Sequence, residues 1–63
     1  MKEHDLLAEY ANGRRDFREV LLREANLQGL VMPNINLIAA DLREANLSKT
    51  DLRCSLLGYT NLR

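Results

Sequence analysis

The sequence predicts an all-β solenoid preceded by a short helix, and two patterns in its 63 residues support this fold class. From Phe17 to the end of the chain an apolar residue stands at every fifth position, whereas the residues before it have helical spacing. A helix turns about 100° per residue, so a five-residue step would scatter these side chains over all of its faces. A flat strand would send successive ones to opposite faces, because the step is odd. The chain must therefore turn once per repeat.

Composition favours one small intracellular domain. Nine Lys and Arg balance nine Asp and Glu, so no net field draws the chain to nucleic acid or to an anionic membrane. Cys54 is the only cysteine, which excludes an internal disulfide and suits a reducing compartment. The charged N-terminus does not resemble a signal peptide, and no apolar run approaches the ~18 residues of a membrane span. We therefore expect a cytoplasmic protein.

Residues 1–14 predict a helical cap on the solenoid. The apolar residues at helical spacing are Leu6, Leu7, Tyr10 and Ala11. Asp5 or an earlier polar residue can cap the start of this helix, and Gly13 stands where a helix end commonly needs a left-handed residue. Because an isolated helix of this length is marginal in water, we expect its apolar face to pack on the first coil, at Phe17 and Leu22.

Residues 15–63 predict the repeat domain itself. Its expected core consists of the central residues of successive five-residue units: Phe17, Leu22, Leu27, Met32, Leu37, Leu42, Leu47 and Leu52. If each unit forms one side of a roughly square coil, the central residue and the residue two before it point inward, and four units complete a coil. Residues four units apart should then stack about 4.7–4.9 Å from each other, as neighbouring strands do. The Asp or Asn that usually precedes the central residue can bond to nearby backbone and stabilise a turn.

The repeat units resemble a known motif. Units such as ANLQG, ADLRE, ANLSK and TDLRC match A(D/N)LXX, the motif of the pentapeptide-repeat family, and the resemblance covers residues 15–63. It implies a right-handed quadrilateral β-helix of about two and a half coils. Four units depart from the motif: Leu21, Val31 and Leu56 stand where Asp or Asn is usual, and in the first unit Arg15 stands where a small residue is usual.

The repeat pattern runs to Arg63 without a cap, so Leu57 and Leu62 are the expected oligomer interface. Unpaired strand edges are templates for pairing with another chain. Either the sequence is the N-terminal piece of a longer protein, or a second copy covers this end. In other members of the family the C-terminal coils commonly meet across a two-fold axis, so the resemblance favours a homo-oligomer.

No residues of the sequence form an obvious site for chemistry. His4 falls in the expected cap helix, and Cys54 falls at an outward position without a base nearby. Asp16, Asp41 and Asp51 are expected to be turn residues, because acid–base catalysis needs convergent groups in a cleft and a convex coil offers none. We expect no enzymatic activity, no cofactor, no metal and no small-molecule substrate.

Two sides of the expected coil carry distinctive outward residues. Arg23-Glu24 and Arg43-Glu44 should stack below Arg63 as a solvated ladder of mixed charge, worth at most ~1 kcal/mol per exposed pair. The adjacent side carries the apolar residues Ile38, Ala39, Leu56 and Tyr59. Contiguous exposed apolar area often marks a partner site, so these four residues are the expected protein-binding patch.

The function expected from these features is a structural or protein-interaction module whose partner is another protein or its own copy. Some relatives protect DNA gyrase by resembling duplex DNA, but that role requires a long acidic prism, and this short neutral chain does not fit it. An appendage of a larger pentapeptide-repeat protein is a further alternative. Nucleic-acid binding is disfavoured, because no basic stripe with stacking aromatic residues is present.

Overall fold

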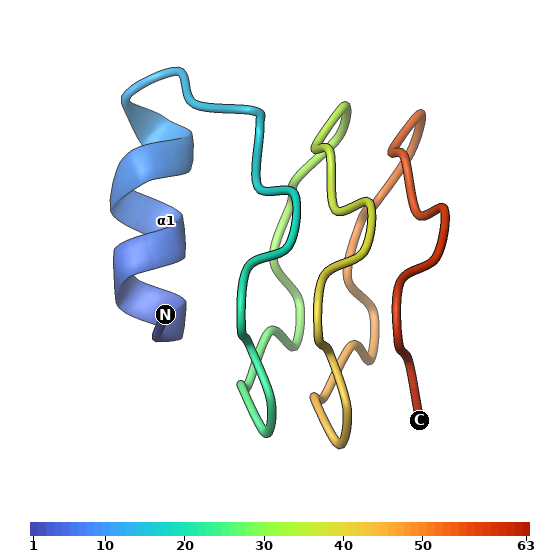
Figure 1. Cartoon of the computed structure of the whole chain (residues 1–63). Coiled ribbons are helices and arrows are strands. Elements are labelled where there is room, and N and C mark those ends of the chain that lie inside the picture. Colours follow the sequence, from blue (N-terminus) through green and yellow to red (C-terminus); the bar gives the residue numbers. More distant parts are fainter.

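The computed structural model describes all 63 residues and contains one helix, α1 (Glu3–Ala11), followed by a chain that winds in successive coils (Figure 1). No continuous strand forms, and neighbouring coils are joined by isolated parallel bridges. The bridged pairs are Asp16–Asn36, Leu21–Asp41, Asn26–Asn46, Val31–Asp51, Asn36–Leu56 and Asp41–Asn61. The two partners of every pair are twenty residues apart. Residues separated by four pentapeptides therefore lie side by side.

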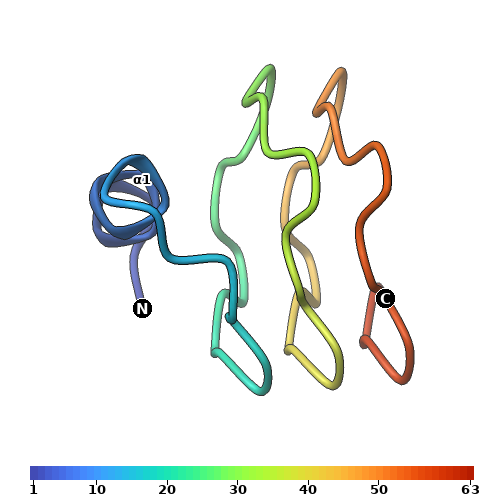
Figure 2. The same ribbon diagram turned by 90° about the horizontal axis from the view of Figure 1, so that it is seen from above.

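Four five-residue segments make up each coil, and we number these sides 1 to 4 in chain order. Side 1 holds 15–19, 35–39 and 55–59; side 2 holds 20–24, 40–44 and 60–63; side 3 holds 25–29 and 45–49; side 4 holds 30–34 and 50–54. The first coil is thus 15–34, the second coil 35–54 and the last half coil 55–63. Both views of the ribbon place α1 against the first coil, at the opposite end of the stack from the last half coil (Figure 1, Figure 2).

Backbone hydrogen bonds join each coil to the next. The N–H of Leu22 donates to the carbonyl of Asp41 at 2.8 Å, and the N–H of Asp41 donates back to the carbonyl of Val20 at 2.9 Å. The chain then turns, because the residue two after each central position has a positive φ, for example 64° at Glu24 and 61° at Glu44. A turn in every pentapeptide limits pairing to single residues. The β-strands expected from the sequence therefore appear only as bridges.

The core is a narrow column of central residues in the first two coils. The central residues with an exposed fraction of at most 1% are Phe17, Leu22, Leu27, Met32, Leu37 and Leu42. Ala25, Ile35 and Ala40 fill buried positions two residues before a central one. Leu47 and Leu52 were also expected in the core but are only half-buried, because no segment of the last half coil covers sides 3 and 4.

The helix α1 packs on the first coil along a narrow line. Leu6 is fully buried within the core cluster, and Tyr10, one turn later, is partly buried against it. Leu7 is 41% exposed and Ala11 is also exposed, so the apolar face predicted for the helix was too wide. Of the four apolar residues expected on this face, only Leu6 and Tyr10 pack against the core.

The two ends of α1 differ in how well the sequence predicted them. The N-cap is Lys2, an earlier polar residue than Asp5, but its side chain makes no capping hydrogen bond, so the side-chain cap expected at the start of the helix does not form. The helix begins earlier because the carbonyl of Lys2 already accepts the backbone N–H of Asp5. Gly13 adopts a φ of 102° directly after the helix, where a left-handed residue was expected. The structure contains no helix with the length and apolar character needed to cross a bilayer.

Candidate interaction surfaces

Outward Asp–Arg pairs stabilise turns of the coil through hydrogen bonds. On side 2, the Oδ1 atom of Asp41 accepts the backbone N–H of Arg43 at 3.2 Å, and the Arg43 guanidinium contacts both carboxylate oxygens, at 2.9 and 2.7 Å. The same arrangement recurs in two further pairs, Asp16 with Arg18 and Asp51 with Arg53. The aspartates thus bond to the turn backbone, as expected of them. Sequence reasoning missed the guanidinium partner, although Asp-x-Arg occurs in three of the units.

These contacts lower the pKa of each aspartate. The guanidinium of Arg43, and then its backbone N–H, lower the pKa of Asp41 to about 2. Hydrogen bonds from Arg18 and Arg53 lower the pKa values of Asp16 and Asp51 for the same reason. A general base works best with a pKa near the operating pH. The three carboxylates are therefore better suited to holding turns than to moving protons.

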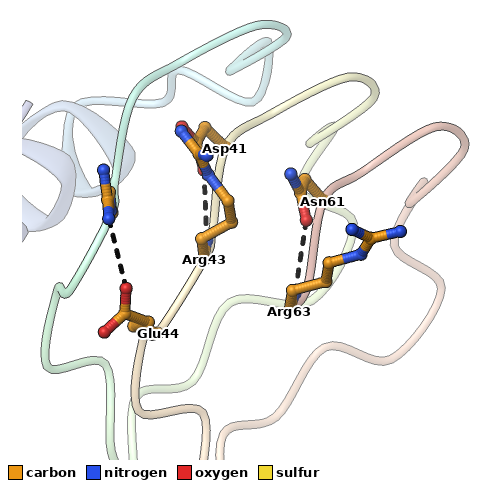
Figure 3. A network of polar contacts seen from close by, with 6 residues as sticks. Asp41, Arg43, Glu44, Asn61 and Arg63 are labelled. Carbon is orange, nitrogen blue, oxygen red and sulfur yellow. Dashed lines mark hydrogen bonds and ion pairs between the residues drawn. The ribbon is translucent and has the colours of Figure 1, made fainter.

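The charged residues of side 2 form only part of the expected ladder (Figure 3). Arg23 reaches Glu44 of the next coil, with Nη2 3.3 Å from Oε1, so one pair of opposite charge joins the two coils as expected of a mixed ladder. Arg43 departs from the prediction, because the aspartate of its own turn holds its guanidinium. In the last unit, Asn61 stands at the position that Asp41 has one coil earlier. Its Oδ1 accepts only the backbone N–H of Arg63, at 3.3 Å.

Side 1 changes from charged in the first coil to apolar in the later segments. The structure brings the four residues of the expected patch onto this side, where Ile38 is half-buried and Ala39 is exposed. Leu56 is 54% exposed and Tyr59 95% exposed. Tyr59 has a φ of 58° and belongs to the turn that ends this segment of side 1. Most of the apolar area of the patch therefore comes from the last half coil.

The end of the last half coil continues this apolar surface. Leu57 and Leu62 occupy central positions but are 37% and 53% exposed. Their equivalents one coil earlier, Leu37 and Leu42, are 0% and 1% exposed, because a further segment of chain covers them. The expected oligomer interface is thus an uncovered section of the core column.

Two exposed apolar residues of the first coil were not predicted as surface features. Leu21 is 67% exposed and Val31 64% exposed. Both stand where the repeat usually has Asp or Asn, so the departure from the motif was the signal that could have found them.

Other polar side chains do not converge. His4 is exposed and its Nε2 lies 3.4 Å from Oδ1 of Asp5, and Cys54 is also exposed. No three His, Cys, Asp or Glu side chains gather where they could hold a metal ion, and the molecule has no pocket.

Comparison with known proteins bears on the repeat domain. A family model described as pentapeptide repeats matches residues 21–57, in eight copies. Neither the curated proteins nor the solved structures gave a match. The matched residues make up more than half of the 63 in the chain and contain the central leucines of the second coil. The chain therefore belongs to the pentapeptide-repeat family.

Proposed function

We propose that this chain is a non-enzymatic structural and protein-interaction module whose partner is a protein, in the first place its own copy. In this proposal the coils form a right-handed quadrilateral β-helix, the fold usual for pentapeptide repeats, with α1 as the cap of one end. The sides of such a rod present side chains at fixed spacing. A cytoplasmic location suits the exposed thiol of Cys54, which stays reduced there.

The concentration of exposed apolar residues on the last half coil is the observation that supports this proposal most. Leu56, Leu57, Tyr59 and Leu62 are 54%, 37%, 95% and 53% exposed. Contiguous exposure of this kind often marks an interface. A second copy would cover Leu57 and Leu62 with contacts like those inside the column, and the neighbouring patch on side 1 extends the same surface.

Size-exclusion chromatography with light scattering, over a range of concentrations, tests the self-association. The 63-residue chain should run as a dimer, and the double substitution Leu57→Lys and Leu62→Lys should make it a monomer, because burying an unpaired ammonium is costly. Leu21→Lys is the matched control, since Leu21 is exposed at the other end of the stack, and it should leave the dimer intact. A monomer at every concentration, or a dimer that the lysines do not affect, would contradict the proposal.

A further inference from the structure

The coils pair through a backbone pattern that repeats along the stack. The N–H of a central residue donates to the carbonyl nineteen positions later, as Leu22 does to Asp41. The residue before a central position donates to the carbonyl twenty-one positions earlier, as Asp41 does to Val20. Every pair of neighbouring coils uses both bonds, together with a third from the turn residue two after each central position, as from Glu24 to Arg43. The pattern therefore leaves complementary groups open at the two ends of the stack.

At the end formed by the last coil, donors that point along the stack have no partner. The central residues whose N–H makes no hydrogen bond are Leu47, Leu52, Leu57 and Leu62. The carbonyls between them, at Thr50, Ser55 and Thr60, accept none. These are the groups that the pattern would join to a further coil, so this end is a strand edge of the kind that templates pairing.

The outer edge of the first coil, beside α1, offers the complementary groups. The carbonyls of Asp16, Leu21, Asn26 and Val31 accept no backbone N–H. The N–H groups of the last three donate to no carbonyl. In the second coil the equivalent groups are all bonded to the coil below. The first coil therefore carries the matching half of the pattern.

A second copy placed head-to-tail would continue the pattern without a change of register. The repeat has ten central positions between Phe17 and Leu62, so the next copy's first unit falls over 45–49, with its Phe17 above Leu47. In this register the unbonded N–H groups of the four central residues of one copy face, in order, the carbonyls of Asp16, Leu21, Asn26 and Val31 of the next, which accept no backbone N–H. The central leucines left exposed at one end would then be covered by the core residues of the next copy.

The segment around α1 occupies the edge that such stacking needs. Nε of Arg14 donates to the carbonyl of Asp16 at 2.7 Å, and the ammonium of Met1 donates to the carbonyl of Leu21 at 2.9 Å. The Tyr10 hydroxyl donates to the neighbouring carbonyl of Pro33 at 2.6 Å. Two of the four carbonyls that would face central residues of the next copy are therefore occupied. Leu6, which is fully buried, covers the core residues beneath them.

We propose that α1 is a plug that prevents the chain from polymerising head-to-tail, and that undocking α1 lets a second copy bind in its place. The partner is bound by the same backbone hydrogen bonds that join the coils. The two contacting surfaces differ, so the contact does not close on itself and produces an open filament. This inference goes beyond the proposed function and does not depend on a dimer of the intact chain.

The variant Leu6→Asp with Tyr10→Phe tests it, because these changes remove the apolar anchor of the plug and one of its hydrogen bonds. Light scattering should show the mass rising about tenfold or more, and electron microscopy should show filaments whose repeat along the axis is about 4.7–4.8 Å per coil. Leu7→Asp is the matched control on the exposed face of α1 and should keep the size of the unmodified chain.

Two additions separate ordered stacking from aggregation of unfolded chains. Introducing Leu57→Lys and Leu62→Lys into the plug variant should abolish the filaments, because the lysines block the other contacting surface. Unmodified chain added at a tenth of the concentration should shorten them, because its open end adds to a growing filament while its own α1 stops growth.

Two results would overturn the inference. One is a plug variant that keeps the circular dichroism of the coil but forms no filaments, and the other is an assembly that the lysines leave unchanged. If Leu6→Asp unfolds the coil, the same measurements are made on the milder variant that carries Leu6→Ala and Tyr10→Phe, and the same two results would overturn the inference. The size of the unmodified chain tests the proposed dimer separately.

Discussion

At the scale of single residues, the turn positions carry a conformational cost that the coil must offset. Eight residues other than glycine have φ values from 58° to 65° at the position two after a central residue. The left-handed conformation costs an L-residue roughly 1–2 kcal/mol. Gly29, with a φ of 74°, is the one glycine at such a position. The stacking of the coils must therefore stabilise turns that most of these residues would not adopt alone.

The glycines provide a test of this cost. Gly29→Ala should destabilise the protein by about 1 kcal/mol, because an alanine resists a positive φ. An added Cβ at Gly29 meets nothing within 4 Å, so backbone strain is the only effect expected. Gly58 has no such φ, and its added Cβ has one neighbour, at 4.0 Å, so Gly58→Ala should stabilise the protein by about 0.4–1 kcal/mol. Urea denaturation measures both changes, and equal signs would contradict the prediction.

The Asp41–Arg43 pair predicts how stability responds to acid. The guanidinium lowers the pKa of Asp41 from 3.8 to about 2 in the folded chain. A lowered folded pKa gives stability that is present above the unfolded pKa and is lost as the pH falls toward the folded one. Asp41→Asn keeps an acceptor for the N–H of Arg43 but removes the charge. The variant should be less stable than the unmodified chain at neutral pH, and the difference should vanish as the pH falls from 4 toward 2.

Thermal unfolding at a series of pH values measures this difference. Asp41→Ala is the control, because it also removes the turn acceptor and should remain less stable than Asp41→Asn even in acid. A gap between Asp41→Asn and the unmodified chain that is the same at every pH would show that the charge of Asp41 contributes nothing.

At the scale of elements, α1 depends on one buried side chain. Leu6 is fully buried, whereas Leu7 is 41% exposed. Leu6→Ala should therefore destabilise the protein by about 2–5 kcal/mol, as for other leucines removed from a core. Leu7→Ala should change the free energy of unfolding by no more than about 0.5 kcal/mol. Denaturation of both variants measures the two values, and a similar cost at the two positions would mean that α1 does not pack through Leu6.

The five-residue period predicted the coil and its inward residues, because an odd step that suits neither helix nor strand leaves few ways to bury every central side chain. The contacts of α1 were less predictable, since which of Leu6 and Leu7 faces inward depends on the shape of the coil. The burial of Leu47 likewise depends on whether a later segment covers it, which no local pattern records. Arg43 pairs with Asp41 of its own turn rather than with a glutamate of the ladder, and this depends on the geometry of the turn.

At the scale of the whole molecule, each coil contacts only its neighbours, so stability should fall along the stack. Leu22 lies between α1 and the second coil and is fully buried, whereas Leu62 is 53% exposed. Leu22→Ala should cost about 2–5 kcal/mol and Leu62→Ala less than about 1 kcal/mol. Both can be compared by urea denaturation at low concentration. Equal costs would mean that Leu62 in the last half coil is as well covered as Leu22 in the first coil.

The alignment of residues four pentapeptides apart is tested most directly by nuclear Overhauser contacts in isotope-labelled protein. The structure predicts a contact between the side chains of Leu22 and Leu42. It also predicts a contact between the amide proton of Leu27 and Asn46, whose carbonyl accepts the N–H of Leu27. Contacts three and four residues apart throughout the segment after Asp16, with none between Leu22 and Leu42, would contradict it.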